Sequence, residues 1–144
     1  MARLETFGFE DLDDAFRRIA DIPDSVTADA LDAMAEVAKA AVKAQGEAMG
    51  VRDPESTVHI LDKISTTKAK ITDSGGYEDI TFSGSRLRGN TRTRNAKIAF
   101  VNEYGKRGQP ARPFIGTAMT KNENAISAPG ENVLGDWIEK EFTR

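Results

Sequence analysis

The sequence has no cysteine among its 144 residues and only one histidine, His59. Without thiols, the chain cannot form a disulfide, a thiolate metal site or a cysteine nucleophile. A single histidine allows at most one serine–histidine or histidine–carboxylate pair, and no partner residues surround His59 in a catalytic pattern. We therefore expect no enzyme activity, no metal and no cofactor, and we interpret His59 as a surface or partly packed residue.

Large hydrophobic residues are also scarce. Aromatic residues make up 7% of the chain and the mean hydropathy is -0.47. No apolar run approaches the roughly 18 residues of a membrane span, and the first residues lack the apolar segment of a secretory signal, so we expect a cytoplasmic protein without membrane contact. With 39% hydrophobic and 30% charged residues, the composition predicts one soluble domain, residues 1–144. Its hydrophobic core should be small, and contacts with partner proteins could bury further apolar surface.

Charge is distributed unevenly along a chain whose formal net charge is -3. Residues 1–36 contain ten acidic and three basic residues, whereas residues 86–112 contain eight basic and one acidic residue. The acidic residues lack the spacing of a calcium-binding loop, and the glycines near the basic residues lack that of a phosphate-binding loop. Opposite charge in separated segments instead favours head-to-tail contact between copies of the chain.

Hydrophobic periodicity predicts helices at both ends of the chain. Residues 9–20 repeat apolar positions at helical spacing, and Pro23 interrupts the pattern before a long alanine-rich helix over residues 25–49. Pro113 suits the first turn of a helix that buries Phe114, and residues 133–142 form a terminal amphipathic helix. We expect a break at residues 122–130, which are polar and contain Pro129.

The middle of the sequence favours strands. Residues 66–72, 77–82 and 97–104 are rich in β-branched, aromatic and alternating apolar residues, and a turn at residues 73–76 joins the first two strands. Residues 83–95 contain four arginines and one large aliphatic residue, which predicts a long, mobile basic loop. The predicted fold is therefore α+β: a small, mainly antiparallel sheet packed by one long N-terminal helix and a C-terminal helix, with a long basic loop.

The basic loop is the main candidate for an interaction site. It could contact nucleic-acid phosphates or an acidic surface on a neighbouring protein. The second alternative is favoured, because the loop has no interleaved aromatic residues and the whole chain is acidic. The candidate interaction residues are basic (Arg86, Arg88, Arg92, Arg94, Arg107 and Arg112) and acidic (Asp11, Asp13 and Asp14).

A short motif resembles a known family. The stretch Asn102-Glu103-Tyr104-Gly105, a short variable loop, and then Ala111-Arg112-Pro113-Phe114 with Ala118 is similar to the tail-completion or head-to-tail joining proteins of long-tailed bacteriophages. These are also described as neck, minor tail or tail-terminator proteins. The motif covers residues 98–118, and the order of the predicted elements is similar over almost the whole chain.

The resemblance implies a structural role in the virion. Proteins of this family are small α+β subunits that form a ring, usually sixfold, at the head-proximal end of the tail tube. This chain would then terminate the tail tube, bind the head connector and leave a channel for DNA, after assembly in the host cytoplasm. The motif residues Tyr104, Gly105, Pro113 and Phe114 carry over as structural residues, and the family has no catalytic residue to carry over. The alternative is a nucleic-acid-binding module that uses residues 83–95.

Overall fold

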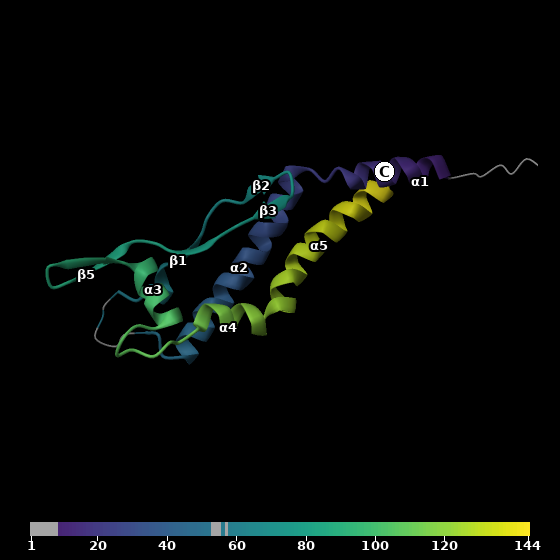
Figure 1. Ribbon diagram of the computed structural model, residues 1–144. Helices are drawn as coiled ribbons and strands as arrows, with labels where there is room; N and C mark the ends of the chain where they lie inside the picture. The colour runs from purple at the N-terminus through teal and green to yellow at the C-terminus, as the bar shows by residue number, and fades with distance from the viewer. Residues whose placement is uncertain (1–8, 53–55, 57) are drawn as a thin grey trace, which may run out of the picture.

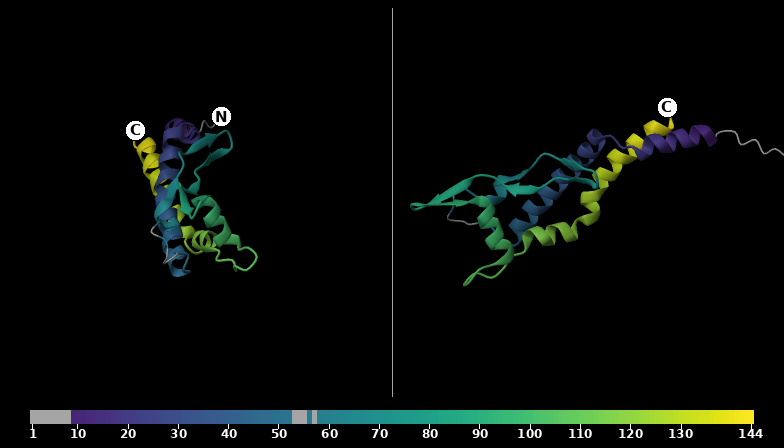
Figure 2. Two further views of the ribbon diagram at one scale, coloured as in Figure 1. Left: turned by 90° about the vertical axis from the view of Figure 1, so that its left-hand side faces the viewer. Right: turned by 45° about the horizontal axis from the view of Figure 1, so that its top comes forward.

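The computed structural model describes residues 9–52, 56 and 58–144, without the side chains of residues 9–12 and of Arg88. Two long helices, α2 (Asp24–Ala48) and α5 (Glu123–Phe142), run side by side in opposite directions along an elongated molecule (Figure 1). Helix α1 (Phe9–Ala20) contacts α5 at one end, whereas the strands of residues 85–94 and the short helices lie towards the other end and the hairpin of residues 70–77 runs back along the N-terminal half of α2 (Figure 2). The predicted α+β class, with a long N-terminal and a C-terminal helix, is confirmed.

The long helix α2 follows the sequence pattern closely. It begins directly after Pro23, and its buried residues are almost all small: Ala30, Ala35, Ala38, Val42 and Gly46. Small side chains let the backbones of neighbouring elements approach closely but bury little apolar area per residue. No helix in the described part of the chain is both long and apolar enough to cross a membrane.

In the described part of the chain, the strands form three antiparallel pairs. Strand β1 (Ile64–Thr66) pairs with β4 (Ile80–Phe82), and β2 (Lys70–Thr72) pairs with β3 (Gly75–Tyr77). The turn predicted at residues 73–76 does join β2 to β3, although the predicted strand over residues 66–72 is split between β1 and β2. Both pairs contact α2.

The hydrophobic core lies at one end of the molecule. It is formed by the C-terminal part of α2, the short helix η1 (Ile60–Lys63), β1, β4, α3 (Asn95–Tyr104) and α4 (Phe114–Lys121). Phe114 is completely buried, as the sequence predicted, and its ring meets that of Phe82 edge to face at 6.0 Å. Such aromatic pairs stabilise a core beyond the area that they bury.

Residues 97–104 do not form the predicted strand but belong to helix α3. The buried residues of α3 are Asn95, Ala99 and Asn102, which recur at helical spacing. The short apolar run from Ile98 to Val101 fits either a strand or a buried helix, and contact with η1, β4 and α4 decides for the helix.

The break predicted over residues 122–130 is also wrong, because only Asn122 separates α4 from α5. Pro129 and Gly130 lie inside α5. Proline has no N–H to donate in the helix ladder, but the helix continues through it. Gly130 is buried where α5 crosses α2: a Cβ at this position would lie 2.5 Å from Sδ of Met34. The glycine serves close helix packing and does not end the helix.

Candidate assembly surfaces

The basic segment 83–95 forms a β-hairpin and not the predicted irregular loop. Strand β5 (Ser85–Arg88) pairs with β6 (Thr91–Arg94) across a two-residue turn at Gly89 and Asn90. Gly89 has a φ of 62°, as the first central residue of a type II′ turn requires. The Gly-Asn pair between alternating Arg and Thr residues was a sequence signal for this hairpin, which the polar composition of the segment obscured.

The base of the hairpin is anchored by Asn95, which is almost completely buried. Its side-chain Nδ2 donates to the carbonyl of Ser83 at 2.7 Å, and its backbone N–H donates to Gly84 at 3.0 Å. A lone two-stranded hairpin is marginally stable in water, so this anchor fixes where the hairpin leaves the body of the protein. The hairpin projects from the end of the molecule opposite α1 (Figure 1).

The register of the hairpin separates its arginines. Arg86 pairs with Thr93, and both line a cleft beneath the hairpin. Arg92 and Arg94 pair with Leu87 and Ser85, so they lie on the opposite face of the hairpin. Arg88 pairs with Thr91 through its backbone, and its side chain lies outside the described residues. The hairpin thus divides the candidate arginines between two surfaces.

The cleft beneath the hairpin has a volume of about 590 Å³. Five elements or segments meet there: the residues after α2, the start of η1, the hairpin, α3 and the loop after α3. Its lining includes the basic residues Arg52, Arg86, Lys97, Lys106 and Arg112, and no carboxylate from the described part of the chain. We call it the basic cleft.

The basic residues of this cleft differ in how they are paired. Arg52 contacts Glu47 at 3.4 Å and Asp62 at 3.1 Å, and Arg112 donates to the carbonyl of Gly50 at 2.7 Å. Desolvation by itself would raise the pKa of Asp62, but hydrogen bonds and charge from Lys43 and Arg52 together lower it. This carboxylate therefore stays ionised and engaged with Arg52 and Lys43.

Two lysines of the cleft differ from these arginines. Lys97 and Lys106 make no ion pair with any other described residue, and both are exposed. His59, which we interpreted as a surface or partly packed residue, is half-buried in the cleft lining. Its buried Nδ1 finds no hydrogen-bond partner among the described residues. The cleft is therefore electropositive, and the Nδ1 atom of His59 could still form a hydrogen bond with a bound group.

The motif Asn102-Glu103-Tyr104-Gly105 joins α3 to α4. The carboxylate of Glu103 accepts backbone N–H groups of Ile115 at 2.8 Å and Gly116 at 2.9 Å, at the start of α4. A carboxylate at this position satisfies free helix donors and complements the helix dipole. The carbonyl of Asn102 accepts the N–H of Arg112 at 2.6 Å. These bonds hold the two helices in a fixed arrangement.

Gly105 and Pro113 shape the loop between these helices. Gly105 has a φ of 76°, and a Cβ there would lie 2.8 Å from the backbone N of Ala111, so only glycine fits this turn. Pro113 directly precedes α4, close to its predicted place in the first turn. The candidate residue Arg107 lies at the exposed tip of this loop, between the bridged residues Lys106 and Gln109.

Tyr104 is placed differently from the other motif residues. It is 69% exposed, and its ring lies against that of Phe100, which is 61% exposed, with centroids 4.7 Å apart and the ring planes tilted by 48°. The two residues lie one helical turn apart on a face of α3 that the core does not cover. Tyr104 is therefore a surface aromatic residue. Of the four motif residues predicted to be structural, only Gly105, Pro113 and Phe114 help to shape or pack the connection between α3 and α4.

The acidic residues lie at the opposite end of the molecule, on α1 (Figure 2). Asp13 and Asp14 are exposed, and Asp13 pairs with Arg17 at 2.9 Å. The side chain of Asp11 lies outside the described residues. The structure therefore does not bring the acidic and basic candidates together within one chain.

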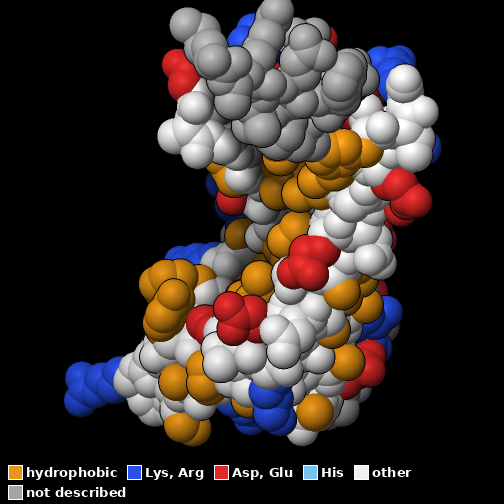
Figure 3. Space-filling model, turned by 90° about the vertical axis from the view of Figure 1, so that its right-hand side faces the viewer, with side chains coloured by type: hydrophobic (Ala, Val, Ile, Leu, Met, Phe, Trp, Pro, Cys, Tyr) orange, Lys and Arg blue, Asp and Glu red, His pale blue; other side chains and the backbone are white. Residues whose placement is uncertain are grey.

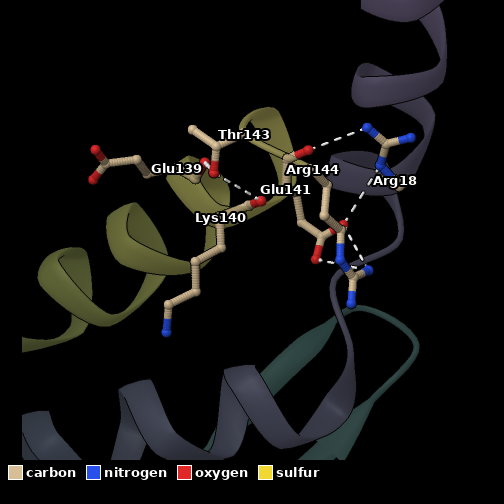
Figure 4. A network of polar contacts seen from close by, with 6 residues as sticks. All are labelled: Arg18, Glu139, Lys140, Glu141, Thr143 and Arg144. Carbon is tan, nitrogen blue, oxygen red and sulfur yellow. Dashed lines mark hydrogen bonds and ion pairs between the residues drawn. The ribbon is translucent and has the colours of Figure 1, made fainter.

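Helix α1 is held to the end of α5 by a polar network (Figure 4). Arg18 donates to the backbone carbonyl of Glu141 at 3.1 Å and contacts its carboxylate at 3.5 Å. Arg144 reaches the same carboxylate at 3.4 Å. Beside this network, the rings of Phe16 and Phe142 meet edge to face at 6.0 Å. These contacts fix the direction in which α1 presents its carboxylates.

The sequence identified only part of the basic cleft. Arg86 and Arg112 were candidates, but Arg52, Lys97 and Lys106 were not. A helical interpretation of residues 95–104 would have placed Lys97 and Val101 on one face, one turn apart. The contribution of Arg52 had no such sequence signal, because it depends on how α2 ends against η1.

Comparison with protein-family models, curated proteins and solved structures finds no match to this chain. Within the described residues, no three His, Cys, Asp or Glu side chains gather in a way that could hold a metal ion. The interpretation of function therefore depends on the surfaces of this chain.

Proposed function

We propose that this chain is a ring-forming structural subunit at the head–tail junction of a long-tailed bacteriophage. There it would terminate the tail tube and join it to the head connector, with DNA passing through the central channel. The observation that carries the proposal is the shape of the subunit: it is elongated and leaves hydrophobic and oppositely charged surfaces exposed at its two ends.

The chain exposes much more surface than a compact protein of its size. Its accessible surface is 10323 Å², whereas a compact monomer of 15.7 kDa exposes about 7,300 Å². The twelve residues without a description would expose at most about 1,900 Å² if fully unfolded. The rest of the chain still exceeds the compact value. Such a surplus is typical of subunits that complete their burial in an assembly.

Exposed hydrophobic residues accompany this surplus. Nine large hydrophobic side chains in the described part of the chain are exposed. Phe16, Ile22 and Phe142 lie near the α1 end, whereas Leu87, Phe100 and Tyr104 lie near the hairpin end. Figure 3 shows hydrophobic side chains along the middle of one face, partly within a hollow. Apolar groups beside charged groups at both ends suit contact with preceding and following copies in a ring.

The shape suggests an assembly subunit, and the motif of residues 98–118 suggests which kind of assembly it belongs to. Its resemblance to tail-completion proteins suggests which ring this subunit forms. The helix–loop–helix built by Glu103, Gly105 and Phe114 gives the motif a physical role, because it fixes the protruding loop beside the basic cleft.

The proposal is tested by measuring the mass of the full-length protein over a concentration series. We expect native mass spectrometry and sedimentation velocity to show a closed oligomer of defined size, alone or with the tail tube and connector proteins. Its stability should fall with added salt, because the contacts join opposite charges. A strict monomer under every condition, including mixtures with both proteins, would contradict the proposal.

A nucleic-acid-binding module is the second candidate. The observation that favours it is that Arg92 and Arg94 lie on the hairpin face away from the cleft and are exposed. Replacing Arg86, Arg88, Arg92 and Arg94 with alanine distinguishes the two. If the chain binds nucleic acid, duplex affinity and its salt dependence should fall while the oligomer is unchanged.

A further inference from the structure

The basic cleft is a concave site in which only part of the positive charge is paired with described carboxylates nearby. Lys97 and Lys106 have no described ionic partner, and the lining contains no described carboxylate. The cleft volume of about 590 Å³ lies in the range of specific binding sites. A group that enters it would be anionic, because it would meet several cations at once.

The shape of the cleft favours carboxylates on a short protein element over a nucleic-acid strand. Non-specific nucleic-acid binding uses a charged groove that follows the backbone, with aromatic rings on which bases stack. Here the lysines and arginines converge on one concavity, and the described residues that line it include no Phe, Tyr or Trp. The aromatic pair Phe100 and Tyr104 belongs to another part of the α3 surface.

The chain itself provides a matching acidic element. Helix α1 carries Asp13 and Asp14, both exposed, in an N-terminal segment that is strongly acidic. Arg18 and Phe16 hold α1 against the end of α5, so it is presented as a fixed element. A preorganised acidic helix loses little conformational freedom when it docks.

The two surfaces cannot meet within one chain. In Figure 1 and in the right-hand view of Figure 2, α1 lies at one end of the elongated molecule, whereas the hairpin and α3, which line the cleft, lie towards the other. A contact between them must therefore join two copies. Contact between different surfaces of identical subunits is heterologous, and it closes into a ring when the rotation per subunit divides a full turn.

We propose that the basic cleft of one copy receives the carboxylates of helix α1 from the next copy, and that this contact sets the head-to-tail direction of the ring. This inference rests on the proposed ring-forming function and names the partner at that contact. Lys97 and Lys106 are the principal cations on one side. Asp13 and Asp14 are the principal described anions on the other, with the Asp13–Arg17 pair opening to allow the contact.

Charge reversal on each side tests the contact in the full-length protein. The cleft variant carries Lys97→Glu and Lys106→Glu, and the helix variant carries Asp13→Lys and Asp14→Lys. All four residues are exposed, so the fold should persist, as circular dichroism can check. A control variant, Lys121→Glu with Lys140→Glu, makes the same charge change as the cleft variant at exposed sites outside the cleft.

We expect assembly to weaken at least about tenfold in the cleft and helix variants, because like charges would face each other. The control variant should assemble like the unmodified protein. An equimolar mixture of the two deficient variants should recover assembly, since each reversed surface then finds its complement. One chain that carries all four substitutions should recover assembly for the same reason.

The possible failures have different meanings. If the unmodified protein forms rings and the cleft variant forms them equally well, the assigned contact is wrong and the proposed function stands. If the unmodified protein is always monomeric, the proposed function itself fails. If the cleft variant assembles normally but loses affinity for a duplex oligonucleotide, the cleft binds nucleic acid and the inference is overturned. Should the cleft variant not fold, Lys97→Gln with Lys106→Gln replaces it, and unchanged assembly of that variant would also overturn the contact.

Discussion

The two ends of this protein are built from different kinds of contact. The compact end, where η1, β1, β4, α3 and α4 surround the C-terminal part of α2, buries large side chains such as Phe114 and Leu61 completely or nearly so. The helical extension, formed by α1, α5 and the N-terminal part of α2, joins its helices through Ala30, Met34 and Gly130 and leaves Phe16 and Phe142 half-exposed. Because burial of large apolar side chains stabilises a fold, we expect the compact end to provide most of the folding stability.

The largest difference between the regions should appear when one phenylalanine in each is truncated. Phe114→Ala removes a completely buried ring from the compact end and should lower the free energy of unfolding by about 3–5 kcal/mol. Phe142→Ala removes a ring that is 47% exposed and should cost less than about 1 kcal/mol. Urea denaturation of both variants measures the difference. Equal losses would show that the extension contributes as much to the core as the compact end does.

A smaller effect should follow from filling the helix crossing in the extension. Gly130→Leu places a side chain against Met34, where a Cβ alone would already be 2.5 Å from Sδ, and should destabilise the protein by about 1–3 kcal/mol. Gly135→Ala is the matched control on the same helix, because no atom lies within 4 Å of its Cβ position. It should stabilise by about 0.5–1 kcal/mol through helix propensity. Thermal unfolding measures whether each substitution raises or lowers the stability of the protein. If Gly130→Leu leaves the stability unchanged, α2 and α5 are not tightly packed at this crossing.

The attachment of α1 should depend on one carboxylate. Glu141→Ala removes the acceptor shared by Arg18 and Arg144, and we expect a local loss of about 1 kcal/mol, because Arg18 is half-exposed. Hydrogen exchange should accelerate in α1 while the compact end stays protected. The control Asp13→Asn breaks only the exposed Asp13–Arg17 pair and should leave exchange almost unchanged. Faster exchange throughout the protein would contradict a local role.

The smallest effect concerns pH, where β3 meets α2. Burial, reinforced by the nearby carboxylates of Asp32 and Glu36, raises the pKa of Glu78 above its ordinary value of 4.5. The folded state then holds the proton more tightly than the unfolded state, so stability falls as the pH rises through the raised pKa and recovers as the pH falls. Glu78→Gln should remove this dependence and stabilise the protein at neutral pH by less than about 1 kcal/mol, because the site is partly solvated. Unfolding followed from pH 4 to pH 8 tests the sign, and a stability that rises with pH only in the unmodified protein would refute it.

The helices that depend on local chemistry could be predicted from the sequence. The acidic first turn and terminal arginines of α1, and Pro23 before α2, act within a few residues of each other, so their boundaries agree with the structure almost to the residue. The position of Pro113 and the burial of Phe114 were predicted for the same reason.

The elements that failed were those with competing local signals. The apolar run 98–101 fits both a strand and a helix, and contacts with η1 and α4 select the helix α3. Arginine-rich composition suggested an irregular loop for residues 83–95, whereas the turn at Gly89 and the buried anchor Asn95 are compatible with a hairpin. Pro129 and Gly130 resemble a helix end, but packing against α2 carries α5 through them.

By itself, the sequence determined how charge is distributed along the chain: acidic residues concentrate at the start, and basic residues concentrate after residue 85. It also determined that the chain has no thiol group. Those properties belong to the residues and hold in any conformation. Only the tertiary structure decided that the basic residues divide between a cleft and an outer hairpin face, and that the acidic helix stands at the far end. That arrangement depends on strand register and on how α2, α5 and α3 pack, which are contacts between residues distant in sequence.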